Sequence, residues 1–155
     1  MANIDKPAGF RVAQMPGSFP VYTGKTTNNL SLTPGDAIVR LPTGSITIAS
    51  AISTAILGVC QSKITGIPNT QQDVLYVPAL PTILFSGQCS GTPVEATIGK
   101  KCDIEGTSGI MELNEDLAST KVAQIVGFEG GVKNTMGAHA RVLFVWASSR
   151  WTGQA

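Results

Sequence analysis

Hydrophobic residues in this chain alternate with other residues over many short stretches, and most stretches end at Pro, Gly or Asn. The clearest stretch is 140–147, where Val142, Phe144 and Trp146 fall on one face and mostly apolar residues fall on the other. A period of two residues is typical of β-strands. Because both faces of this stretch are largely apolar, we expect both to be covered, one by the core and the other by a loop, an arm or a neighbouring subunit.

The same pattern predicts eight strands. They cover residues 36–41, 45–49, 56–62, 73–77, 82–85, 101–104, 121–128 and 140–147. Pro-Gly and Gly-Gly pairs between them favour tight turns. Many short strands at this spacing indicate an all-β fold, a small β-barrel or sandwich. Only residues 49–55 and 115–119 are expected to form short helical turns, the second capped by Asn114.

The first 34 residues follow a different pattern. They are rich in Pro, Gly, Asn and Thr, and their apolar residues, such as Ile4, Phe10 and Phe19, stand alone. Such a segment cannot bury enough apolar area by itself to offset the entropy lost on ordering. We therefore expect residues 1–34 to form an extended N-terminal arm that orders against another surface, and residues 35–155 to form the β-domain.

The composition is poor in charge. Only 14% of residues are Asp, Glu, Lys or Arg and 43% are hydrophobic, whereas soluble domains carry roughly 25% charged residues. We expect much of this weakly hydrated surface to be covered by other protein. The alternative is a monomer with a Ser/Thr-rich exterior, as many extracellular proteins have. A short C-terminal tail contains Arg150 and Trp151, two residue types frequent at interface centres.

Charge is also distributed unevenly. Residues 95–116 hold six acids against Lys100 and Lys101, while residues 117–155 hold four basic residues against Glu129 alone. The two regions could meet across a subunit interface, and ordinary solvated loops are the alternative. The net charge of +1 and the scattered Lys and Arg residues argue against nucleic-acid binding, which needs clustered basic residues.

Side chains that carry chemistry are scarce. The single histidine, His139, stands at the entrance to the last predicted strand. Cys60, Cys89 and Cys102 are far apart and form no CxxC pair, so we expect three free thiols that act as small apolar residues. The chain has no metal-ligand spacing and no phosphate-binding glycine loop. We therefore expect no enzyme, no catalytic or metal site and no cofactor.

Targeting signals are missing as well. The longest apolar stretch, 46–60, is broken by polar residues and is shorter than the roughly 20 residues that a spanning helix needs. The first 14 residues include Asp5, Lys6 and Arg11 and lack the apolar run of a signal peptide. We expect no membrane association and synthesis without secretion.

The opening Met-Ala-Asn-Ile-Asp-Lys-Pro-Ala-Gly-Phe-Arg-Val resembles the start of small head proteins of tailed bacteriophages. Three further motifs follow in the same order: Gly35-Asp36 with an apolar strand, Gly58-Val59 within a strand, and a closing Ala-Arg-Val-Leu-Phe-Val strand. The family that this resemblance implies is that of the capsid decoration, or cement, proteins. Its members often carry Pro after Gly-Phe-Arg, where this chain has Val12.

This resemblance implies a structural virion protein on the outer surface of the phage head, present in the host cytoplasm during assembly. Such proteins are small and β-rich, often form homotrimers, and bind the major capsid protein so that neighbouring capsomers are bridged against the pressure of the packaged DNA. On this interpretation the arm contacts the capsid, and the tail lies at an oligomer or capsid interface. The arm residues are Ile4, Asp5, Pro7, Phe10, Arg11 and Phe19, and the tail residues are Arg150 and Trp151.

Two other classes of protein stay open at this point. One is a carbohydrate- or receptor-binding β-module of a phage head fibre or tail, although two Trp and two Tyr are few for that task. The other is a small trimeric β-barrel enzyme with its site between subunits, against which the single histidine counts.

Overall fold

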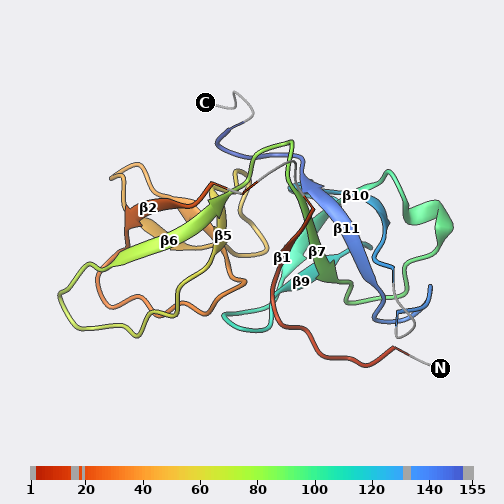
Figure 1. Cartoon of the computed structure of the whole chain (residues 1–155), viewed down its shortest axis with the longest axis horizontal. Helices are drawn as coiled ribbons and strands as arrows, with labels where there is room; N and C mark the ends of the chain where they lie inside the picture. The colour runs from red at the N-terminus through yellow and green to blue at the C-terminus, as the bar shows by residue number, and fades with distance from the viewer. Residues whose placement is uncertain (1–2, 15–17, 19, 131–133, 152–155) are drawn as a thin grey trace.

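The chain folds into two antiparallel β-sheets (Figure 1). The structure is a computed structural model that describes residues 3–14, 18, 20–130 and 134–151. No α-helix occurs in these residues, and their one helical turn is the 3-10 helix η1 (Glu95–Thr97).

The six-stranded sheet contains both the first and the last strand of the chain. Its order is β1 (Arg11–Gln14), β7 (Leu84–Gln88), β11 (Arg141–Trp146), β10 (Ala123–Phe128), β8 (Lys101–Glu105) and β9 (Glu112–Asn114). The five-stranded sheet is formed by the intervening chain. Its order is β2 (Tyr22–Lys25), β6 (Asp73–Pro78), β5 (Gly58–Cys60), β3 (Ala37–Arg40) and β4 (Ile46–Ile48).

The main core lies between the two sheets. Phe85, Phe144 and Trp146 enter it from the six-stranded sheet, and Val59 and Val77 enter it from the five-stranded sheet. All five side chains are buried. This face-to-face packing of apolar strand faces is what defines a sandwich.

A second, smaller core lies on the other face of the five-stranded sheet. It contains Ile38, Val74 and Tyr76 from the strands, and Leu32 and Ile64 from the loops that cover them. Leu32 and Ile64 are joined by an isolated antiparallel bridge. The five-stranded sheet is therefore apolar on both faces.

All eight predicted strands are confirmed, and the sandwich alternative fits the two sheets. The barrel alternative is wrong because neither sheet closes. Segments at the two edges of the five-stranded sheet meet only at a single bridge between Thr26 and Ile46, which does not extend into a ladder.

Neither of the two predicted helical segments is a helix. Residues 51–52 and 115–116 form turns only, and Asn114 accepts the N–H of Asp116 at the start of the second turn, as a cap would. The N–H of Ala49 instead continues the β3–β4 pairing by donating to the carbonyl oxygen of Ala37. The N–H groups of Ser119 and Thr120 donate to the buried carboxylate of Asp103. These two N–H groups therefore cannot donate to carbonyl oxygens one turn earlier, as a helix would require.

No strand was predicted in the first 34 residues, and the structure has two there. β1 pairs with β7, and β2 pairs with β6. Each of these strands has four residues, and the pairing of β1 is interrupted by a bulge between Val12 and Gln14. Both strands are therefore specified by long-range partners rather than by a local alternation.

The outer face of β11 is half-buried rather than fully covered. Its residues alternate between the core and this outer face, where Arg141, Leu143 and Val145 are partly exposed. The expectation that both faces are covered is thus met only on the core side within the described part of the chain.

Candidate functional site

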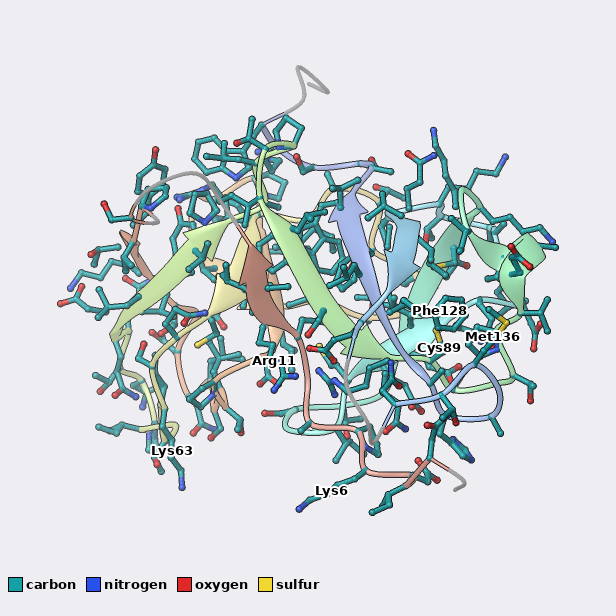
Figure 2. The ribbon with its side chains drawn as sticks, turned by 45° about the vertical axis from the view of Figure 1, so that its right-hand side comes forward. Lys6, Arg11, Lys63, Cys89, Phe128 and Met136 are labelled. Atoms are coloured by element: carbon teal, nitrogen blue, oxygen red, sulfur yellow. The ribbon has the colours of Figure 1, made fainter. Side chains whose placement is uncertain are left out.

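The N-terminal segment that carries the family resemblance lies along one end of the six-stranded sheet. The side chain of Asn3 donates to the carbonyl oxygens of Thr135 (2.7 Å) and Ala138 (2.8 Å), in the loop that precedes β11. Gln88, at the end of β7, donates to Asp5 (2.9 Å) and accepts the N–H of Lys6 (3.0 Å). Figure 2 shows Lys6 at the lower edge of the molecule with its side chain pointing outward.

Phe10 anchors this segment in the main core. Its side chain is 2% exposed, and its ring packs edge-on against Phe144 and Trp146, each with a centroid distance of 5.4 Å. Phe10 was predicted as a capsid contact. In this structure its ring is buried in the core and leaves almost no surface with which to contact another protein.

Two of the motifs that carry the resemblance touch each other. The N–H of Phe10 donates to the carbonyl oxygen of Gly35 (2.8 Å), and a Cβ at Gly9 would lie only 2.6 Å from that oxygen. Both glycines have positive φ angles, which other residues rarely adopt. Asp36, next in the chain, is fully buried and accepts the N–H groups of Thr33 and Gly109. These motif residues therefore stabilise the fold.

Arg11 belongs to a charged network on the outer face of the same sheet. Glu129 binds Arg11 at 2.6 Å and Arg141 at 2.8 Å, and both arginines also donate to the hydroxyl of Ser86. Burial raises the pKa of the Glu129 carboxyl, but the hydrogen bonds and the positive charges of the two guanidinium groups together outweigh burial, so the pKa is lowered. Arg11 thus ties the first strand to β10 and β11.

The surface of the N-terminal segment is formed by the residues between these anchors. The side chain of Ile4 is 77% exposed, Asp5 is exposed and Pro7 is half-buried. Phe19, also predicted for the arm, lies outside the described residues. Of the predicted arm contacts, Ile4, Asp5 and Arg11 are thus the exposed ones.

His139 lies beneath this segment. Its Nδ1 is 3.6 Å from Oδ1 of Asp5. His139 also lines a cavity of about 310 Å³, together with Asn3, Lys6, Arg11, Gln88 and Arg141. Within the described residues no group of three or more His, Cys, Asp or Glu side chains is placed to hold a metal ion.

The C-terminal tail crosses from the six-stranded sheet to the five-stranded sheet. The N–H of Arg150 donates to the carbonyl oxygen of Ile56 (3.1 Å). The indole N–H of Trp151 donates to the carbonyl oxygen of Leu57 (2.6 Å), and its ring packs edge-on against Tyr22 at 5.4 Å. Trp151 keeps 36% of its surface exposed, so it is both an internal anchor and part of an exposed aromatic pair.

Sequence reasoning did not identify Asn3, Gln88 and Tyr22 as parts of these sites. Asn3 stands within the recognised opening motif, which was a usable signal. Gln88 is a buried polar residue at the end of β7, beyond the predicted strand 82–85, and nothing near it in the sequence indicates its partners Asp5 and Lys6.

The three cysteines are free and buried, as predicted. Burial raises the pKa of each thiol, and that of Cys102 rises to about 12. Among the described residues, no helix has the length and apolarity needed to cross a membrane.

No protein-family model matches this chain, and no curated protein matches it significantly. Inference of its function therefore depends on the residues and surfaces described above.

Proposed function

We propose that this chain is a structural virion protein, a capsid decoration protein that binds the outer surface of a phage head. It would contact the major capsid protein, act as a homo-oligomer, most simply a trimer, and bridge neighbouring capsomers. Its presence in the host cytoplasm would precede its assembly onto the head. Its role would be mechanical, because added contacts between capsomers raise the barrier to rupture by packaged DNA.

The observation that carries this proposal is the N-terminal segment. Four side-chain hydrogen bonds, two from Asn3 and two at Gln88, hold this segment against the end of β7 and the loop before β11, yet Ile4 between them is 77% exposed. An apolar side chain displayed on an ordered backbone loses little entropy on binding. The low charge of the chain supports the same conclusion, because weakly hydrated surface is easily covered by protein.

Because Phe10 is buried, fewer residues of the N-terminal segment can contact the capsid. The segment adds Ile4, Asp5 and Pro7 to the surface of a folded sandwich, and Arg11 supports it through Glu129. The contact would therefore be made by residues 3–7 in place on the sheet, rather than by a free arm of 34 residues.

Head binding tests this proposal. The purified chain should co-sediment in a sucrose gradient with shells assembled from the major capsid protein of the same genome. Ile4→Asp should weaken that binding by about tenfold or more, since interface anchors contribute about 2 kcal/mol. Leu75→Asp is the matched control, because Leu75 is 45% exposed on the five-stranded sheet.

Two failures have different meanings. If the wild-type chain does not bind the shells, the decoration function is wrong. If the wild type and Ile4→Asp bind equally, the function holds but the N-terminal segment is not the contact.

A carbohydrate-binding module is the second candidate, because Tyr22 and Trp151 form a half-exposed aromatic pair. Sugar rings commonly stack on such side chains. A glycan array probed with the wild type and Tyr22→Ala separates this class, since binding lost in the variant would favour it over decoration.

A further inference from the structure

A groove of about 440 Å³ lies beside the hairpin of β3 and β4. Its lining combines apolar, hydroxyl and cationic side chains, including Val39, Ile48, Ile52, Ser53, Arg40 and Arg150. Ile52 is 84% exposed, the highest value among the exposed large hydrophobic residues of the described chain. An open groove with apolar walls suits a protein segment better than a small enclosed ligand.

The two arginines give the groove its charge. Arg40 donates to the carbonyl oxygen of Gly44 (2.8 Å) and lies 3.4 Å from the hydroxyl of Tyr76. Within the described residues neither arginine has a carboxylate within ion-pair distance. A guanidinium group binds carboxylates in a planar, two-bond arrangement, so the groove is suited to an acidic segment.

The chain itself carries such a segment in the turn after β9. The carboxylates of Glu115 and Asp116 converge over Gly91, where a Cβ would lie 2.3 Å from one and 3.0 Å from the other. Asp116 is exposed, and Leu117 beside it is 50% exposed. Glu115 and Asp116 belong to none of the ion pairs of the described residues.

The surroundings of this turn are acidic as well. Burial raises the pKa of Glu115, and the neighbouring Asp116 and Glu105 carboxylates raise it further. Like charges held this close repel one another unless a cation from elsewhere joins them. Among the described residues, the two arginines of the groove thus have no anionic partner, and the two carboxylates of the turn have no cationic partner.

We propose that the groove of one copy receives the Glu115–Asp116–Leu117 turn of a second copy. Arg150 would pair with the exposed Asp116, and Leu117 would lie against Ile52. The two surfaces differ, so the contact is head-to-tail, and head-to-tail contacts form closed rings when the rotation between copies allows it. This inference concerns self-association and does not depend on binding to a phage head.

Charge exchange tests the pairing. Sedimentation velocity of the purified full-length chain should show self-association that weakens as salt is added, since salt screens such pairs. Arg150→Glu and Asp116→Arg should each weaken association about tenfold or more. The double variant Arg150→Glu with Asp116→Arg should restore it, because the charges are exchanged across the same contact.

Lys63→Glu is the matched control, since Lys63 is exposed outside the groove (Figure 2) and its reversal changes the net charge equally. It should leave association unchanged. A monomeric wild type, an equal effect of Lys63→Glu and Arg150→Glu, or a double variant that stays weak would each overturn the proposal. Circular dichroism of each variant, all of which replace exposed residues, checks that the fold is retained. Head binding can succeed or fail independently of all these results.

Discussion

The ring of Phe10 lies so close to Gly87 that a Cβ at position 87 would be 2.7 Å from its Cδ1 atom. This contact joins the N-terminal segment to the end of β7, and the same ring touches Phe144 and Trp146. The segment is therefore part of the main core at one residue and part of the surface at Ile4, six residues earlier. Substitutions at these two residues should have opposite consequences for folding and for binding.

Phe10→Ala should lower the free energy of unfolding by about 3–5 kcal/mol, the usual cost of removing a buried Phe ring. Ile4→Ala should change it by less than about 0.5 kcal/mol, because the side chain already faces water. Urea unfolding followed by tryptophan fluorescence measures both. Similar small changes in the two variants would mean that Phe10 is not in the core in solution.

Trp151 should stabilise the chain through its bond to Leu57. Trp151→Phe keeps an aromatic ring beside Tyr22 but leaves the Leu57 carbonyl without its indole donor, which should cost about 1 kcal/mol. Trp151→Ala also removes the ring contact and should cost about 2 kcal/mol. Ile52→Ala is the control, since Ile52 is 84% exposed and its loss should be neutral for the monomer. If thermal melts gave the same melting temperature for all three variants, Trp151 would not have this stabilising role.

The cysteines should be unreactive in the folded protein. All three are buried, and burial raises the pKa of Cys102 to about 12, so almost no thiolate forms near pH 8. A thiol-specific reagent should label no cysteine in the native chain and all three after denaturation without reductant. One rapidly labelled cysteine in the native chain would show that a thiol reaches solvent.

The alternation of apolar residues correctly predicts strands that bury one face. It does not predict segments whose structure depends on pairing with residues far away in the sequence. The residues Arg-Val-Ala-Gln of β1 and Tyr-Thr-Gly-Lys of β2 have no apolar period, and each is a strand because β7 or β6 lies beside it. The pattern of residues 115–119 predicts a capped helix. They do not form one because Asp103, more than ten residues earlier, accepts the Ser119 and Thr120 N–H groups.

The residues of the candidate sites also divide into those that the sequence can predict and those that only the fold brings together. Ile4 and Trp151 could be selected from sequence because isolated apolar residues in polar segments are unusual. Their partners could not be selected, since the Leu57 carbonyl and the Gln88 side chain become partners only through the fold. Phe10 was selected for the same reason as Ile4, and only the fold, which places the Phe10 ring over Gly87, distinguishes the buried residue from the exposed one.

Acid should weaken the chain through Glu129. The hydrogen bonds and the positive charges of Arg11 and Arg141 together outweigh burial and hold the pKa of Glu129 below its ordinary value of 4.5. A carboxyl whose folded pKa is lowered contributes stability that is present above the unfolded pKa and is lost as pH falls through the folded pKa. Glu129→Gln should therefore cost about 1–2 kcal/mol near pH 7, and the difference from wild type should shrink below about pH 4.

The stability linked to Glu115 should depend on pH in the opposite sense to that linked to Glu129, so Glu115 provides the matched comparison. Burial, together with Asp116 and Glu105, raises its folded pKa above 4.5, so the charged form is disfavoured in the folded chain. Stability linked to such a group is present below the unfolded pKa and is lost as pH rises through the folded pKa. Glu115→Gln should therefore stabilise the monomer relative to wild type near pH 7, and this advantage should disappear as pH falls below about 4. Urea unfolding of both variants across this range measures the two slopes. If Glu115→Gln destabilises the chain at neutral pH by as much as Glu129→Gln, then the Glu115 carboxylate is compensated in solution by a cation that the described residues do not supply.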